Sequence, residues 1–446
     1  MTDTTQFATF MLVLLVFWPS YNLVLAVFVW WRPKPGGPEV PSRHPLEYWI
    51  IIPALNEERV VANTVRSALA LDGARTPVQV VVVDDGSDDG TPQVLAEIDD
   101  HRLHVLRRTL PEARQGKGEA LNHAFAYIRG LAEEAGTVHR TIIGVIDGDG
   151  RGEPGMLSEI SAYFGARVVG AVQCRVRIHN RTNLLAFLQD LEFSCVVDAS
   201  QSLRDVVGTV GLGGNGQFVR LKTLMDLGDA PWSACLVEDL ELGLRVHLDG
   251  QRIRYATHAT ITQQGLVDVK RLLRQRTRWG QGNLQCLRYV PRLIRAKHVG
   301  SVALLEFLQY LLTPWLVAPM TLLVTLLVGI NFYAQFTGHG IAGFTANGGN
   351  TLLALGIWLV ALVLPGLIWG VVHRLKHGDE PLWRCLLVGL TYPFFLILGS
   401  VSTLRALYRH FAGRNTWAKT ERLAEKEVPV VGGPAVAAPV PVPKIA

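Results

Sequence analysis

Charged side chains are scarce in this chain. Only 18% of its 446 residues are Asp, Glu, Lys or Arg, whereas 49% are hydrophobic, which excludes a protein that is soluble along its whole length. Cysteine is also rare, and the five present form no Cys-x-x-Cys pair and have no histidine at metal-ligand spacing. We therefore expect buried thiols in a reducing compartment rather than a disulfide framework or a zinc site.

The apolar residues gather at the two ends of the chain. Phe7–Trp31 carries no charge and is long enough to span the ~30 Å hydrocarbon layer of a bilayer. A signal peptide fits poorly, because a basic leading region and a small-residue cleavage site are both missing. Arg32 and Lys34 follow at once, so the positive-inside rule predicts that the N-terminus lies outside and the next domain in the cytoplasm. The net charge of +5 is explained by such membrane flanks and requires no nucleic acid partner.

The second apolar block lies near the C-terminus. Thr351–Val372 and Leu382–Leu404 are predicted spans, while we interpret Ser301–Trp315 as interfacial and Val317–Phe336 as spanning. Three such spans would put the basic tail outside, against the charge rule. Either the stretch from residue 301 makes two short spans, or the segment with Pro393 is re-entrant, and the sequence leaves both open.

These features divide the chain into four parts. Residues 1–33 form an N-terminal transmembrane helix, and residues 34–298 a cytoplasmic domain that includes interfacial helices. Residues 299–405 form interfacial and transmembrane helices, and residues 406–446 a basic, then Pro/Val/Ala-rich, disordered cytoplasmic tail. The expected protein is a multi-pass protein of the plasma membrane.

Strand and helix patterns alternate in the cytoplasmic domain. Strands are predicted at 48–55, 78–87, 103–108 and 142–146, with helices at 56–71, 91–98 and 116–132 between them. This alternation predicts an α/β fold with a parallel, doubly wound sheet, whose ligands bind beyond the carboxyl ends of the strands. Three polar clusters fall at such ends: Asn56–Glu57, Asp84–Asp85 and Asp147–Asp149.

The sequence IDGDG sets two carboxylates, Asp147 and Asp149, at the end of a buried strand. Like charges this close are costly unless a positive group lies between them. A divalent cation that carries a diphosphate would neutralise them, which predicts Mg²⁺ or Mn²⁺. The alternative is the nucleophile loop of haloacid-dehalogenase-type phosphatases, but the later lysine and acidic loop of those enzymes are not found in order.

Four further segments carry groups suited to a nucleotide or a sugar. Asp85 could accept hydrogen bonds from a base or ribose, or belong to an ordinary Asp–Gly turn. Lys117 and Asn122 begin a helix where an anion could bind, although the segment lacks the full P-loop pattern.

Glu238 and Asp239 begin another predicted helix, and one of the two carboxylates is a candidate general base. The alternative is that both are ordinary N-terminal acids, which the helix dipole stabilises. In QRTRW, Gln275, Arg278 and Trp279 could share a cleft in which arginine pairs with phosphate and indole stacks under a sugar. The alternative is a basic juxtamembrane helix with Trp279 as its interfacial anchor.

Taken in order, these segments resemble the family 2 glycosyltransferases, specifically the membrane-embedded processive synthases of cellulose, chitin, hyaluronan and poly-N-acetylglucosamine. The resemblance covers Trp49 to Arg292 and implies a GT-A-like domain that binds a nucleotide sugar. The implied roles are a general base at Asp239; a metal site at Asp147 and Asp149; donor contacts at Pro53, Asn56, Glu57, Asp85, Lys117, Asp147 and Arg278; and acceptor contacts at Gly213, Gly214, Asn215, Glu238, Gln275 and Trp279.

Two positions differ from the motifs of these glycosyltransferases. Gly150 stands where the family often has a metal-binding histidine or hydroxyl residue, and LVED replaces the TED-type motif before the base.

The resemblance implies an inverting, processive β-glycosyltransferase that polymerises a sugar from a UDP-sugar donor and passes the polysaccharide across the bilayer. An accessory subunit is left open. Two alternatives remain: non-processive transfer to a lipid or lipid phosphate, and a transporter with a nucleotide-sensing domain.

Overall fold

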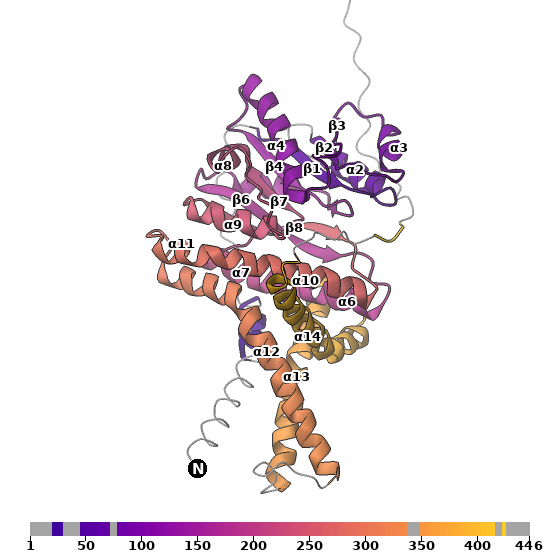
Figure 1. Ribbon diagram of the computed structural model, residues 1–446, viewed down its shortest axis with the longest axis vertical. Helices are drawn as coiled ribbons and strands as arrows, with labels where there is room; N and C mark the ends of the chain where they lie inside the picture. The colour runs from indigo at the N-terminus through magenta and orange to yellow at the C-terminus, as the bar shows by residue number, and fades with distance from the viewer. Residues whose placement is uncertain (1–19, 30–44, 72–77, 338–347, 415–421, 425–446) are drawn as a thin grey trace, which may run out of the picture.

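The computed structural model describes residues 20–29, 45–71, 78–337, 348–414 and 422–424. One eight-stranded sheet forms the upper part of the molecule, and long helices extend below it (Figure 1). The strands are β1 (Glu47–Ala54), β2 (Gln79–Asp84), β3 (Leu103–Arg107), β4 (Thr141–Val145), β5 (Arg151–Gly152), β6 (Val169–Ile178), β7 (Gln217–Arg220) and β8 (Arg252–Gln263).

Helices cover the sheet and connect it to the lower part. Those of the sheet domain are α2 (Val61–Leu69), α3 (Thr91–Ala96), α4 (Lys117–Glu134), α5 (Met156–Tyr163), α8 (Leu221–Asp226) and α9 (Glu238–Leu248). Below them lie α6 (Leu184–Leu191), the π-helix η1 (Glu192–Val197), α7 (Asp198–Val207), α10 (Val269–Cys286), the 3₁₀-helix η2 (Leu287–Tyr289), α11 (Val290–Arg295), α12 (Ser301–Thr337), α13 (Gly348–His377) and α14 (Leu382–Phe411).

The sheet has the strand order β3-β2-β1-β4-β7-β6-β8-β5, and it is mixed rather than parallel. The first four strands run parallel as predicted, but β7 is antiparallel to β4 and β6, and β5 is antiparallel to β8. The predicted parallel strands are therefore confirmed, and the sheet continues beyond them with strands that the alternation did not predict, some of them antiparallel. The chain enters β7 from residues 211–216, which lie at the carboxyl edge of β4, so β7 must run back from that edge.

Alternating residues of the parallel strands pack into two cores, one on each face of the sheet. Ile50 and Ile52 of β1 belong to one core, and Ile51 belongs to the other; all three are fully buried. Both faces are covered by helices, which explains why these strands are continuous apolar runs in the sequence. A rigid sheet buried in this way fixes the positions of the polar residues that follow its strands.

Charged contacts join the sheet domain to the lower helices. Lys376 near the end of α13 donates to Asp198 of α7 at 2.6 Å, and His373 lies 3.0 Å from Asp190 of α6. Arg177 of β6 also bonds Asp190 at 3.0 Å. These buried, multiply bonded carboxylates hold α13 against the underside of the domain.

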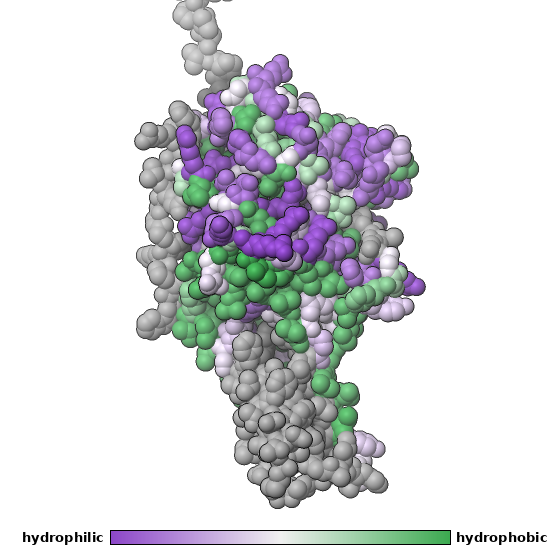
Figure 2. Space-filling model, turned by 60° about the vertical axis from the view of Figure 1, so that its left-hand side comes forward, coloured by the Kyte–Doolittle hydropathy of each residue, from purple (hydrophilic) through white to green (hydrophobic). Residues whose placement is uncertain are grey.

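Helix α12 is continuous through Pro314 and Pro319, so the predicted interfacial and spanning parts of residues 301–336 lie in one helix. Within the described residues, two helical stretches are long and apolar enough to cross a membrane, Leu359–His377 and Leu382–Phe411. Hydrophobic residues form a band directly beneath the hydrophilic surface of the sheet domain (Figure 2). This arrangement suits a domain seated on a bilayer.

Several predicted segments lie wholly or partly outside the described residues. Of the predicted N-terminal span, only the helix Ser20–Val29 is described. The connection between the predicted spans Val317–Phe336 and Thr351–Val372 falls largely on residues 338–347, outside the described residues, and of the tail only residues 406–414 and 422–424 are described.

Candidate active site

A cavity of about 1080 Å³ lies where the carboxyl ends of β1, β2 and β4 meet α9 and α10. Most of the residues predicted for the site line this one space, although they come from segments spread over more than half of the chain. These are Pro53, Glu57, Asp85, Lys117, Asp147, Gly213, Gly214, Asn215, Glu238, Asp239, Gln275, Arg278 and Trp279.

Lys117 joins three parts of the cavity. Its ammonium Nζ donates to Asp147 Oδ1 at 2.6 Å and to the carbonyl oxygen of Gly214 at 3.2 Å, and it lies 3.4 Å from Glu238 Oε1. Burial lowers the pKa of Lys117, but the carboxylates of Asp147, Glu238 and Asp239 raise it more, so the side chain stays charged. A fixed cation therefore lies among the carboxylates at the end of β4 and the start of α9.

Asp239 lies in the first turn of α9, close to the same cation. A β-carbon added at Gly214 would lie 3.0 Å from Asp239 Oδ2 and 2.8 Å from Lys117 Nζ, so the two groups converge over this glycine. Burial and the neighbouring Glu238 raise the pKa of Asp239 to about 7, although Lys117 opposes this shift. A carboxylate poised near neutral pH can accept a proton from a substrate hydroxyl.

Asp85, at the end of β2, is held in a fixed orientation. Arg108 donates to its Oδ1 at 2.6 Å and the backbone N–H of Arg114 donates to its Oδ2 at 3.1 Å. Burial raises the pKa of Asp85 despite the adjacent Arg108 guanidinium. The carboxylate therefore offers lone pairs in defined directions at the cavity wall.

Asn56 does not line the cavity. Its backbone adopts the left-handed conformation, with φ 53°, and its side chain exchanges two hydrogen bonds with Asp88. These bonds tie the loop after β1 to the loop after β2, so Asn56 shapes the cavity wall from outside. Asn122 is likewise directed elsewhere, since its side chain bonds the backbone of Trp232.

Asp149 is buried and also lies outside the cavity lining. Its Oδ2 accepts from the backbone N–H of Gln264 at 3.0 Å, and its Oδ1 lies 3.0 Å from a guanidinium nitrogen of Arg422. Burial raises the pKa of Asp149 and nearby Asp147 raises it further, while Arg422 lowers it. The side chain of Gln264 pairs with both the backbone N–H and the carbonyl of Leu423, which fixes Arg422 beside the aspartate.

A guanidinium at Asp149 shows that this carboxylate accepts a cation there. Within the described residues no three His, Cys, Asp or Glu side chains gather around one point, so protein ligands alone do not complete a metal site. Two carboxylates on one turn, with the remaining positions left to phosphate and water, are the donor set that Mg²⁺ or Mn²⁺ takes in nucleotide sites. Asp147 and Asp149 are the two carboxylates that such a site would use.

The turn that carries both aspartates is tightly packed. The carbonyl of Gly148 accepts from the hydroxyl of Thr64 at 2.7 Å. A β-carbon at Gly150 would lie 2.6 Å from Ile146 and 2.8 Å from Asn215 Oδ1, closer than real contacts allow. Glycine at position 150 is therefore a packing requirement, which explains the departure seen in the sequence.

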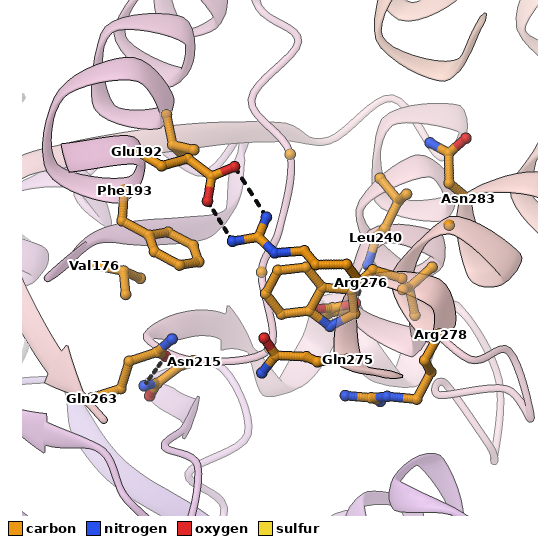
Figure 3. A pocket seen from close by; sticks show the side chains of 18 of the residues that line it. Val176, Glu192, Phe193, Asn215, Leu240, Gln263, Gln275, Arg276, Arg278 and Asn283 are labelled. Carbon is orange, nitrogen blue, oxygen red and sulfur yellow. Dashed lines mark hydrogen bonds and ion pairs between the residues drawn. The ribbon is translucent and has the colours of Figure 1, made fainter. Parts of the chain in front are cut away.

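Helix α10 presents the residues of the QRTRW segment to the cavity. In Figure 3, Arg276 points toward Glu192, and Arg278 lies on the other side of Gln275, apart from this ion pair. Among the described residues Arg278 has no carboxylate partner, and its guanidinium makes only a 3.5 Å contact with the carbonyl of Leu236. A guanidinium held in this way suits an anionic ligand.

Local sequence patterns did not identify some of the residues at the site. Arg422 lies far along the chain in a segment predicted to be disordered, and Glu192 lies in a stretch whose sequence looks simply helical. Gln263 of β8 accepts from Asn215 at 3.0 Å and fixes the loop that lines the cavity (Figure 3). Only the folded chain brings these residues to the predicted ones.

The cavity continues from the carboxylates into an apolar region between the lower helices. Its lining there includes Tyr310 and Pro314 of α12, Leu362 of α13 and Phe395 of α14. Leu316 of α12 lines the cavity as well, and its side chain is 67% exposed. The cavity is thus polar at the sheet edge and apolar where it reaches the helices that suit a membrane.

Comparisons with known proteins agree with this architecture. Residues 44–282 match the protein family described as glycosyltransferase like family 2. The chain is 33% identical over 274 residues to a β-monoglucosyldiacylglycerol synthase of Trichormus variabilis, covering 60% of this chain and 55% of that protein. It is 26% identical over 291 residues to a poly-β-1,6-N-acetyl-D-glucosamine synthase of Staphylococcus epidermidis, covering 63% and 65%. The chain therefore spans about half to two thirds of the length of these relatives.

Among solved structures, the fold is similar to a mannosyltransferase from Pyrobaculum calidifontis in complex with GDP-Man and Mn²⁺. The TM-score is 0.55 at 18% identity, and the match covers 91% of this chain and 99% of that one. This likeness confirms the predicted GT-A-like fold class.

Proposed function

Because the chain belongs to glycosyltransferase like family 2 and is a glycosyltransferase, we propose that it transfers a hexose from a UDP-sugar to an acceptor hydroxyl with inversion. The observation that carries this proposal is the convergence of Asp239, Lys117 and Arg278 in one cavity. A base, a fixed cation and a guanidinium available to an anion are the groups that such a reaction requires.

In the proposed reaction, Asp239 accepts the proton of the acceptor hydroxyl as the oxygen attacks the anomeric carbon. The bond to the diphosphate oxygen breaks on the opposite face, so the configuration inverts in a single step. Lys117 and Arg278 stabilise the negative charge that develops on the leaving diphosphate, and because they are already oriented, this stabilisation needs little reorganisation. The pKa of about 7 suits Asp239 for this role.

Asp147 and Asp149 would hold Mg²⁺ or Mn²⁺. When bound, the ion supplies positive charge to the diphosphate. Asp85 is the proposed partner of the nucleobase, because its fixed oxygens face the cavity, with Pro53 and Glu57 forming the adjacent wall. The assignments of Asp147, Asp85, Pro53 and Glu57 rest on their positions in the cavity, and that of Asp149 rests on its place in the same turn as Asp147.

We propose a lipid hydroxyl as the acceptor. Support comes from the apolar part of the cavity, which reaches from Asp239 to the exposed side chain of Leu316 on α12. An acyl chain could lie along that path while its polar end meets the base. The relative with 33% identity is named for a glucosylated diacylglycerol, which agrees with this acceptor class.

The second candidate is a growing polysaccharide, made processively and passed across the membrane. It is favoured by Gln275, Arg278 and Trp279, which line the cavity together, since an indole surface suits a sugar ring at the end of a polymer. A relative named as a polysaccharide synthase supports it too. Translocation would further require a multi-pass membrane protein.

A donor panel separates these candidates. Membranes that contain the protein receive radiolabelled UDP-glucose, UDP-N-acetylglucosamine, UDP-galactose, UDP-glucuronate or GDP-mannose, with Mg²⁺ or Mn²⁺ and dioleoylglycerol. Label in the organic extract supports the lipid acceptor, and label in long ethanol-insoluble product supports the polymer. Absence of transfer from every donor would overturn the proposed function.

One variant tests the path of the lipid. Leu316→Trp should obstruct the apolar part of the cavity and lower transfer to dioleoylglycerol, while hydrolysis of the donor by water continues. Leu312→Trp is the matched control, since Leu312 is exposed on the same helix and does not line the cavity. Equal losses in the two variants would contradict the proposed path.

A further inference from the structure

The π-helix η1 interrupts the connection between α6 and α7 beside the cavity. It spans Glu192–Val197, and both Glu192 and Phe193 line the cavity. A π-turn inserts extra chain into a helix and redirects the side chains around it, and such turns are frequent at functional sites. Here it brings a carboxylate and an aromatic ring toward α10.

Glu192 forms a two-point ion pair with Arg276 of α10. Arg276 Nη1 donates to Glu192 Oε1 at 3.0 Å and its Nη2 donates to Oε2 (Figure 3). Both side chains are about four fifths buried, at 18% and 21% exposed. A forked pair fixes the plane of the guanidinium as well as its position.

The fixed guanidinium of Arg276 lies over the indole of Trp279, with 4.6 Å between its central carbon and the ring centroid. Phe193 meets the same indole edge-on, at 6.4 Å and 83°. Arg276 also lies 5.8 Å from the ring of Phe193 and 5.6 Å from that of Phe395 on α14. The indole of Trp279 is therefore fixed by a cation over one face and by an aromatic ring packed nearly at right angles to it, while its side chain still lines the cavity.

We propose that Glu192 and Arg276 are positioning residues, which act through Trp279 to set the acceptor-binding surface. This inference rests on the proposed function, since Trp279 is there the acceptor contact. Neither residue touches the donor groups of the site: Asp85, Lys117 and Arg278 belong to other contacts. Disturbing the pair should therefore change the use of the acceptor and spare the donor.

The simplest test replaces Glu192 by Gln and Arg276 by Lys. Gln keeps the size of the side chain but loses the ion pair, and Lys keeps the charge but loses the fork and the planar stack. For each variant we expect the acceptor KM, measured with dioleoylglycerol or its monoglucoside, to rise about tenfold. Donor KM and the rate of donor hydrolysis without acceptor should stay unchanged.

Glu133→Gln and Arg129→Lys are the matched controls. This pair lies on the exposed side of α4, 3.9 Å apart, and is remote from the cavity lining. These controls should leave every kinetic constant unchanged. A rise in donor KM, or an equal fall in donor hydrolysis, for the Glu192 and Arg276 variants would contradict the proposal.

A double variant with the two charges exchanged distinguishes positioning of Trp279 from an ion pair that only stabilises the fold. The double variant Glu192→Arg with Arg276→Glu restores an ion pair between η1 and α10, but it places a carboxylate beside Trp279. If the pair only ties the two helices together, the double variant should recover the acceptor KM along with thermal stability. Positioning predicts that the acceptor KM stays high even when thermal stability recovers.

The position of Trp279 can be followed without turnover. In protein labelled with 5-fluorotryptophan, the ¹⁹F resonance of Trp279 is assigned by its loss in Trp279→Phe. We expect Glu192→Gln to shift or broaden this resonance and Glu133→Gln to leave it in place. An unmoved resonance would overturn the inference. A moved resonance in a protein that transfers no sugar would uphold the positioning of Trp279 by this ion pair and overturn the proposed function.

Discussion

The ammonium of Lys117 lies 2.6 Å from Asp147 and 3.4 Å from Glu238, so one cation connects the end of β4 with the start of α9. The candidate base, Asp239, shares this environment, since Lys117 is the charged group that lowers its pKa while burial and Glu238 raise it. The pH dependence of activity therefore reports on the interaction between Lys117 and Asp239.

Activity should rise with pH through about 7. The ionised form of Asp239 accepts the proton, and burial together with Glu238 raises its pKa to about 7, so the ionised fraction grows across that range. The measurement is the pH dependence of kcat/KM at saturating metal. A profile that is flat from pH 6 to 8 would contradict a base with this pKa.

Lys117→Met should shift this acidic limb to higher pH. Removing the cation removes the charged group that lowers the pKa of Asp239, so ionisation needs a higher pH. The rate at the new optimum should also fall, because charge on the leaving diphosphate loses a partner. A limb that moves to lower pH would show that Lys117 does not act on the base.

Arg278→Gln should weaken donor binding. The guanidinium has no carboxylate partner among the described residues, so we expect it to bond the diphosphate, and its loss should raise donor KM by about 10- to 100-fold. Arg274→Gln is the control, because Arg274 is exposed on the same helix. Unchanged UDP binding in Arg278→Gln, measured by calorimetry, would count against this role.

Arg422→Gln should strengthen the binding of Mn²⁺ in the absence of nucleotide. Arg422 lies 3.0 Å from Asp149 Oδ1, so its guanidinium competes with any cation for that oxygen. The measurement is a titration of free Mn²⁺ by electron paramagnetic resonance, with an expected severalfold decrease in Kd. Weaker binding in the variant would mean that Arg422 instead supports the metal site.

Gly150→Ser should destabilise the protein, by about 1–3 kcal/mol, because a β-carbon there collides with Ile146 and Asn215. Thermal unfolding in detergent measures the effect. Gly130→Ala is the control, since nothing lies within 4 Å of a β-carbon at that helical position. A fully stable Gly150→Ser protein would show that the turn can open to admit a further metal ligand.

The sequence predicted the parallel part of the sheet because strand and helix patterns alternate along residues 48–146. It predicted most of the cavity as well, because carboxyl ends of parallel strands meet at one edge, so Glu57, Asp85 and Asp147 had to converge. The start of α9 at Glu238 also followed from local pattern. Each of these features depends on neighbours in the sequence.

Features set by distant contacts were not predictable in this way. The direction of β7 depends on where residues 211–216 cross the sheet edge, and the π-turn at Glu192 leaves the helical periodicity of its sequence almost unchanged. Arg422 reaches Asp149 only because Gln264 binds the backbone of Leu423. No local propensity encodes such contacts.

The configuration of the newly formed glycosidic bond tests the central account most directly. Single-step attack assisted by Asp239 on an α-linked UDP-sugar gives a β-linked product. Proton NMR of the isolated product reports this configuration through the coupling of the anomeric hydrogen, and Asp239→Asn should yield about 10³-fold less product. A β-linkage from the unmodified protein, lost in Asp239→Asn, is the result we predict. An α-linkage, or undiminished transfer by Asp239→Asn, would contradict inversion with Asp239 as the base.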